Sequence, residues 1–241
     1  MRNDKARDLL RPVQAISINN IPHYDYHLHT KWTDGKDSIL DMYVAACEQN
    51  LQAVLFSEHV RKTSGEWFSQ FSRDVRSMND KRCMALVGIE TRVNDFMGNL
   101  DCTEDMIEKS DLVVASVHRF PNIVDGSPID FDNIDVSEAL DIEYNLTMGL
   151  LDNDKVDILG HPFGMSISRY KVQPSDEKML SVIKKAAKKG IAVEINAVYH
   201  SNLWQMINWC QESAALVSLG SDAHSTDDVG LIIRKLKGSE L

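Results

Sequence analysis

Residues 23–30 read His-Tyr-Asp-Tyr-His-Leu-His-Thr, a short β-prone run that carries Asp25, His27 and His29 at alternate positions. Because side chains alternate between the two faces of a strand, we expect these three to point the same way at its carboxyl end. Two imidazoles on one face can bind the same divalent ion. A His-x-His pair can also lie by chance on a solvent-exposed face, so this stretch alone leaves both interpretations open.

The bulk composition limits the classes of function. The chain has 241 residues, of which 43% are hydrophobic and 26% charged, and a formal net charge of −10. This length suits one large α/β domain, or two small ones. The acidic balance argues against binding of long nucleic acid, because such affinity comes mainly from Lys and Arg facing phosphates. A small anionic substrate remains compatible, since a few cations or metal ions can invert the field locally.

The cysteines and the first residues predict the compartment. Four cysteines lie far apart without a C-x-x-C motif, which is typical of reduced thiols in an intracellular protein. Residues 1–20 hold no apolar run of signal-peptide length, and no stretch approaches the ~20 apolar residues that cross a bilayer. We therefore expect a cytoplasmic protein with no membrane partner.

Apolar runs alternate with helical patterns along the chain. We predict strands at 23–29, 53–57, 85–89, 111–117, 156–160, 191–195 and 216–220, and helices at 39–47, 67–78, 136–151, 175–189, 201–213 and 227–237. Such alternation indicates a parallel sheet covered by helices, and seven units favour a (β/α) barrel over an open sheet. In such barrels the chemistry lies at the carboxyl ends of the strands. We read residues 1–22 as an N-terminal extension and residues 23–241 as one domain.

Metal-binding residue types follow the predicted strands. They are His27, His29, His59, Glu90, His118, His161, Asp222 and His224. Singly, each has an ordinary explanation: a lone histidine is often a hydrogen-bonded turn residue, and a lone glutamate a solvated loop acid. A closed barrel would bring six imidazoles and at least two carboxylates to one mouth, where they need cations for charge balance. The pattern therefore predicts a polynuclear site for Zn²⁺, Mn²⁺ or Fe²⁺, with Glu90 able to bridge two ions.

These residues belong to short motifs that resemble, in order, those of the PHP (polymerase and histidinol phosphatase) family. The motifs are His27-Leu28-His29-Thr30 with Thr33-Asp34-Gly35, Ser57-Glu58-His59, Gly88-Ile89-Glu90, Ser116-Val117-His118, Gly160-His161-Pro162 and Ser221-Asp222-Ala223-His224. The resemblance covers about residues 24–230. It implies a distorted seven-stranded (β/α)7 barrel, in agreement with the strand count. Glu58 departs from the usual Asp of the family, and Thr33 from the usual Ser.

Carried over by position, the resemblance implies two or three divalent ions at three sites. The expected ligands are His27, His29, Glu90 and Asp222 for the first ion, Glu90, His118 and His161 for the second, and His59, His224 and Asp34 for the third. Asp34 also reads as an ordinary turn aspartate, and members of the family vary at this position between Asp and a displaced His.

The resemblance to the histidinol phosphatase branch implies hydrolysis of a small phosphate monoester. A hydroxide that bridges the first two ions would attack phosphorus in line with the leaving alkoxide. We expect Asp222, His224 and Arg119 to form the catalytic set, with Asp222 as a ligand that can also accept a proton.

Three residues are predicted to contact the substrate. Arg119, directly after His118, is the first candidate for a phosphate clamp through its planar fork, and Arg169 is the second. Asn196, at the end of the sixth strand, is expected to hydrogen-bond substrate or a bound water. Arg61 and Arg92 also follow ligand-bearing turns, and any of these arginines can equally be an ordinary surface residue.

Two other functions remain open at this point. The polymerase-associated branch suggests a phosphodiesterase or nuclease, which the acidic chain and the lack of a basic stripe disfavour. A regulatory module that kept the metals but lost turnover is the other alternative. The partner that we expect is a small phosphorylated metabolite, whose identity depends on the loops at 62–72, 119–134 and 162–174.

Overall fold

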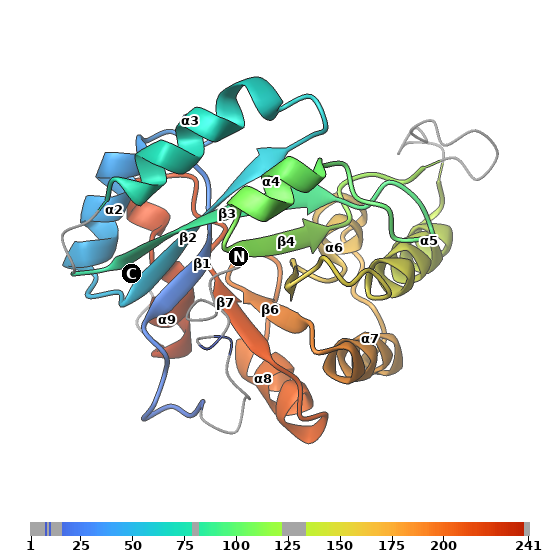
Figure 1. The fold of residues 1–241 in the computed structure, drawn as a ribbon. Helices are drawn as coiled ribbons and strands as arrows, with labels where there is room; N and C mark the ends of the chain where they lie inside the picture. Colours follow the sequence, from blue (N-terminus) through green and yellow to red (C-terminus); the bar gives the residue numbers. More distant parts are fainter. Residues whose placement is uncertain (1–7, 9, 11–15, 79–81, 122–133, 239–241) are drawn as a thin grey trace.

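Seven parallel strands form one sheet whose spatial order follows the chain (Figure 1). In this computed structural model, residues 8, 10, 16–78, 82–121 and 134–238 are described. The strands are β1 (Tyr24–Leu28), β2 (Ala53–Val60), β3 (Met84–Arg92), β4 (Leu112–Ser116), β5 (Ile158–Leu159), β6 (Ala192–Asn196) and β7 (Val217–Gly220). Most of the predicted extension, and residues 122–133 of one predicted specificity loop, lie outside the described residues.

The sheet closes back on itself just beyond β1 and β7. The backbone N–H of His29 donates to the carbonyl of Ala223 at 2.8 Å, and the N–H of Ala223 donates to the carbonyl of His27 at 3.1 Å. Below this seam, the Tyr24 hydroxyl donates to the carbonyl of Val217 at 3.0 Å. The predicted seven-stranded barrel is therefore confirmed, and the carboxyl ends of its strands meet at one mouth.

Helices cover the outside of the barrel (Figure 1). They are α2 (Ile39–Glu48), α3 (Gly65–Arg76), α4 (Glu104–Lys109), α5 (Val136–Leu150), α6 (Gly164–Tyr170), α7 (Asp176–Lys189), α8 (Leu203–Glu212) and α9 (Leu231–Leu236), with a 3-10 turn, η3, at Thr226–Asp228. Because strands are covered on one face and packed inside the barrel on the other, runs such as 53–56 are fully buried. No helix among the described residues has both the length and the apolarity to cross a membrane.

Several boundaries differ from the sequence prediction. β2 and β3 run three residues beyond the predicted ends, so His59 and Glu90 lie inside strands. The strand predicted at 156–160 shrinks to two residues, and the Asp157 carboxylate before it accepts from the N–H of Val113 at 2.9 Å. The last predicted helix starts late, since Gly230 adopts a left-handed φ of 73° that a helix cannot include. The short helices α4 and α6 were not predicted.

Candidate metal centre

Six imidazoles and three carboxylates meet at the mouth of the barrel. They form four overlapping groups in which one ligand atom of each member lies within 4.8 Å of the others. The groups are His27, His29 and Asp222; His27, Glu90 and His161; His59, Glu90 and His118; and His29, Asp34, His59 and His224. All nine residues predicted from the motifs are thus brought together.

The β1 strand supplies the innermost imidazoles. His27 Nε2 lies 3.4 Å from Glu90 Oε2 and 3.6 Å from Asp222 Oδ1. His29 Nε2 lies 3.3 Å from Asp222 Oδ1 and 3.6 Å from Glu90 Oε2. Leu28, between them, points into the apolar core, as strand alternation requires.

Asp25 does not join them, contrary to the expectation from its spacing. Its carboxylate accepts from the N–H of Ser221 and from the N–H of Gly230, both at 2.9 Å. The register between β1 and β2 shifts between Asp25 and Leu28, which breaks the simple alternation. Burial raises the pKa of Asp25 to about 6. Asp25 therefore holds the segment after β7 in place and is not a ligand candidate.

Glu90, on β3, is the centre of the cluster. Its Oε1 lies 3.0 Å from His118 Nε2 and 2.9 Å from His161 Nε2, and its Oε2 lies 2.8 Å from His59 Nδ1. The Ser116 hydroxyl donates to Oε1 at 2.8 Å. Burial alone would raise the pKa of Glu90, but the surrounding histidines outweigh it and hold this pKa well below its usual value. Glu90 is thus an ionised carboxylate shared by both halves of the cluster.

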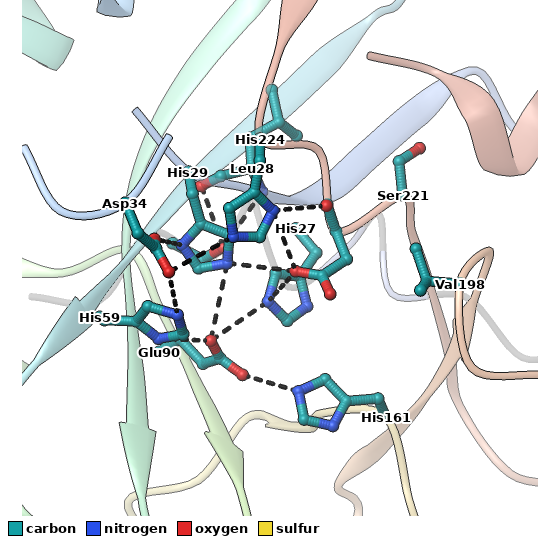
Figure 2. A network of polar contacts seen from close by, with 12 residues as sticks. His27, Leu28, His29, Asp34, His59, Glu90, His161, Val198, Ser221 and His224 are labelled. Atoms are coloured by element: carbon teal, nitrogen blue, oxygen red, sulfur yellow. Dashed lines mark hydrogen bonds and ion pairs between the residues drawn. The ribbon is translucent and has the colours of Figure 1, made fainter. Parts of the chain in front are cut away.

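The outer part of the cluster lies around Asp34. Asp34 Oδ2 is 3.3 Å from His59 Nε2 and 3.5 Å from His224 Nε2. Hydrogen bonds from these two imidazoles hold the pKa of Asp34 well below its usual value. Figure 2 shows Asp34, His59 and His224 directed toward one another, with Glu90 between His59 and His161. Asp34 therefore occupies a position from which it can act as a ligand.

The donor atoms fit divalent cations. Within the described part of the chain, the Nε2 atoms of His27 and His29 and the Nδ1 atom of His29 are buried without a hydrogen-bond partner. Burial would lower the pKa of His59, but Glu90 and Asp34 outweigh it and raise this pKa to about 10. Buried imidazole lone pairs and carboxylates that only a cation can satisfy are the ligand chemistry of Zn²⁺, Mn²⁺ and Fe²⁺.

A buried carboxylate behind the ligands was not predicted. Glu194, on β6, accepts from His27 Nδ1 at 2.6 Å through Oε1, and from the backbone N–H of His161 at 2.5 Å through Oε2. This leaves Nε2 of His27 facing the cluster, which is the usual arrangement behind a metal-binding histidine. A glutamate inside an otherwise apolar strand was the sequence signal, because a buried charge requires partners.

Glu58, which departs from the family motif, also has a supporting position. It accepts from the backbone N–H of Thr30 at 2.8 Å and from the hydroxyls of Thr30 and Thr33. Burial raises the pKa of Glu58 to about 7. Glu58 thereby fixes the loop that carries Asp34.

An open pocket of about 400 Å³ leads to the cluster. Besides the candidate ligands, its lining residues are Arg61, Met165, Ser168, Arg169 and Tyr199. Arg169 was predicted to contact substrate, and it lines the pocket. Arg119 does not line it, and its Nη2 donates instead to Asn94 Oδ1 at 3.3 Å.

Asn196 is also absent from the described lining of the pocket, because it is fully buried. Its side-chain amide donates to Glu194 Oε1 at 3.1 Å, and its carbonyl accepts from the N–H of Val198 at 2.8 Å. Asn196 is thus placed to support Glu194 and not to contact a ligand in the pocket. Tyr199, which the sequence did not single out, packs its ring 4.6 Å from that of His161.

Comparison with known proteins agrees with the geometry. The family model of the PHP domain matches residues 25–198. A probable phosphatase of Thermoanaerobacter sp. is 27% identical over 88% of this chain and 83% of its own length. A probable phosphatase of Clostridium novyi is 30% identical over 60% of this chain, and the match spans 54% of that relative. Among solved structures, histidinol phosphate phosphatase from Lactococcus lactis, complexed with zinc, L-histidinol and phosphate, superposes with a TM-score of 0.64 at 17% identity, covering 90% of this chain and 92% of that one.

Proposed function

The chain belongs to the PHP domain family, and from this membership and the geometry of the barrel mouth we propose that it is a metal-dependent phosphatase acting on a small phosphate monoester. The observation that carries the proposal is the single carboxylate of Glu90 contacted by five imidazoles in a pocket open to solvent. Probable phosphatases among the relatives, and the phosphate and histidinol in the Lactococcus structure, support the same class of reaction.

We assign the ligands to three positions, of which the first two share Glu90. The proposed sets are His27, His29, Glu90 and Asp222; Glu90, His118 and His161; and Asp34, His59 and His224. When bound, the divalent ions would polarise a phosphoryl oxygen and lower the pKa of a water to about 7. Zinc in the Lactococcus structure supports Zn²⁺ as one candidate, beside Mn²⁺ and Fe²⁺.

The protein's own residues would bind and orient the ester. Arg169 lines the pocket on α6, three residues from Ser166, whose N–H is held by the buried carboxylate of Glu143 at 2.7 Å. An arginine on an anchored helix is suited to hold a phosphate through its planar fork. Burial would raise the pKa of Asp222, but the neighbouring histidines outweigh it and hold this pKa well below its usual value, so Asp222 stays ionised as a ligand.

We further propose that residues 23–241 act as one catalytic domain with residues 1–22 as an extension. A cytoplasmic location is proposed as well, and the four cysteines, which lie far apart in the sequence and form no C-x-x-C motif, support it.

The test is turnover with defined metals. The protein is loaded with Mn²⁺ or Zn²⁺ and assayed with an aryl phosphate, histidinol phosphate, nucleotides and single-stranded DNA. Monoester hydrolysis that a chelator abolishes is the expected result. Degradation of DNA without monoester hydrolysis would favour the nuclease alternative, and a metal-loaded but inert protein would favour a regulatory role.

A further inference from the structure

Three arginines gather around one carboxylate beside the metal centre. Arg92 Nη2 lies 2.7 Å from Asp101 Oδ2, and Arg61 Nε lies 3.9 Å from the same oxygen. Arg119 lies within electrostatic range of both Arg92 and Asp101, and its Nη2 donates to Asn94 Oδ1. We call Arg61, Arg92 and Arg119 the arginine cluster; with Asp101 it carries a net charge of about +2.

Two donors of the arginine cluster are unused. The Nε–H groups of Arg92 and Arg119 are buried and make no hydrogen bond within the described part of the chain. Burial lowers the pKa of Arg61 and of Arg119, and repulsion from Arg92 lowers each of them further. A guanidinium stays protonated in proteins, so both Nε–H groups are charged donors that can each bind an acceptor. Glu90 also acts on Arg61, but five imidazoles already contact its carboxylate.

The arginine cluster lies nearer the mouth of the barrel than the metal centre does. Arg92 follows Glu90 by two residues on β3, so both point to the same face, with Arg92 roughly 6–7 Å nearer the mouth. Arg61 follows His59 at the same spacing and lines the pocket. Arg119 directly follows His118, and the arginine cluster meets the pocket through Arg61, because Arg92 and Arg119 are not among the described lining residues. An oxyanion at the arginine cluster and a phosphate at the metal centre would thus be separated by about the length of a three-carbon molecule.

The rest of the pocket supplies no site for a cationic group. Apart from the candidate ligands, the described lining consists of Arg61, Arg169, Ser168, Tyr199 and Met165. Every carboxylate among these described lining residues is a proposed metal ligand. The pocket therefore favours a second negative charge on the substrate over an ammonium group.

We propose that the arginine cluster binds a second oxyanion of the substrate, either a carboxylate or a second phosphate, carried by the same small molecule as the scissile phosphate. This inference rests on the proposed phosphatase function and specifies its substrate class. It assigns Arg119 to the distal anion and leaves the scissile phosphate to the metal centre and Arg169.

The test compares three esters with the metal-loaded protein. Glycerol 3-phosphate carries one phosphate, 3-phosphoglycerate carries a carboxylate in addition, and glycerol 1,3-bisphosphate carries a second phosphate in addition and no carboxylate. We expect kcat/KM to be at least about tenfold higher for one or both of the doubly anionic esters, and the better of the two identifies the second oxyanion.

Arg61→Gln and Arg119→Gln, which keep size but remove charge, should each reduce this preference by about 10-fold or more. Arg73→Gln, an exposed arginine on α3, is the matched control and should leave all three rates unchanged. An equal loss on all three esters would overturn the proposal, because the arginines would then act on the scissile phosphate. A wild-type protein without preference would overturn it as well.

A binding measurement separates this inference from the proposed function. If no ester is hydrolysed with any metal, the proposed function fails, and calorimetric titration of the protein as purified with sulfate then decides on the arginine cluster. The Arg61→Gln/Arg119→Gln double variant should lose one binding event that wild type and Arg73→Gln retain. Identical isotherms would overturn the inference.

Discussion

Replacing Glu194 by glutamine tests whether the centre depends on its buried support. Three donors converge on this carboxylate: His27 Nδ1 at 2.6 Å, the side-chain amide of Asn196 at 3.1 Å and the backbone N–H of His161 at 2.5 Å. Glutamine has one acceptor oxygen and one NH₂ group, so its NH₂ group must face at least one of these three N–H donors, and that hydrogen bond is lost. His27 and His161, which are proposed to contact different ions, would both lose orientation.

The magnitude follows from the hydrogen bonds that are lost. Burial would raise the pKa of Glu194, but His27 and His161 outweigh it and hold this pKa below its usual value, so the acceptor is ionised. A hydrogen bond to a charged group contributes about 1.5–3 kcal/mol, and each 1.4 kcal/mol corresponds to tenfold in affinity. Loss of one such bond predicts metal binding that is about 10- to 100-fold weaker, in the range found when partners behind metal ligands are removed.

The assay is competition for Zn²⁺ and Mn²⁺ with a chromophoric chelator, together with metal content after dialysis. Glu212→Gln, an exposed acid on α8, is the matched control and should behave as wild type. Thermal unfolding in excess chelator separates positioning from folding, because Glu194→Gln should unfold near the wild-type temperature once no metal is present. Metal dissociation constants within twofold of wild type would refute the assignment of Glu194 as a positioning residue.

Three further predictions concern the same region. His161→Ala, which removes a 2.9 Å contact to Glu90, should lose one ion and reduce kcat by more than about 100-fold while the barrel stays folded. The control His23→Ala, outside the centre, should keep its metal content and its kcat, and full activity of His161→Ala would refute the ligand assignment. Gly220→Ala would place a methyl group 1.9 Å from Glu194 Oε1 and 2.9 Å from His27 Cβ, so denaturant titration should show a free energy of unfolding lower by about 1–3 kcal/mol, together with weaker metal binding. Gly65→Ala, whose methyl group would lie 4.0 Å from Met106, is the control and should show neither effect. Equal stability of the two variants would contradict the tight contact at Gly220. Burial raises the pKa of Glu143 to about 7 from a usual 4.5, so the folded protein binds this proton more tightly than the unfolded chain does. The stability that protonated Glu143 contributes is complete below pH 4.5 and is lost, by up to about 3 kcal/mol, as the pH rises through 7. The difference in unfolding free energy between wild type and Glu143→Gln should therefore fall over that range, and a constant difference would contradict the raised pKa.

The fold and the gathering of ligands could be predicted because both depend on order along the chain. Six of the seven apolar runs end in a metal-binding residue type, and these ends must meet at one mouth once the sheet is parallel and closed. Boundaries were less predictable. His59 and Glu90 looked like strand ends because they are polar, yet β2 and β3 continue past them. Polar residues are stable inside these strands only because partners from other strands meet them, which the local sequence does not show.

Side-chain direction explains why Arg119 is not among the described lining residues of the pocket although it adjoins His118. Adjacent residues in an extended chain point in different directions, whereas residues two apart share a face. Arg61 follows His59 by two residues and lines the pocket, so this spacing was a sequence signal for it. A contact between Arg119 and the substrate stays a prediction.

The seam of the barrel explains why this mouth is suited to hold ions. Asp222 adopts a left-handed φ of 53°, which is costly for a residue with a side chain and persists only where surrounding contacts enforce it. Those contacts are the hydrogen bonds of the next residue, Ala223, to His27 and His29, which join the last strand to the first. An ion held by His27, His29 and Asp222 as proposed would therefore cross-link both sides of the seam, about 195 residues apart in the chain, at the point where the backbone is strained. Because such an ion binds only the closed barrel, its binding free energy would also stabilise closure. The same binding free energy would offset the conformational cost of the left-handed backbone at Asp222.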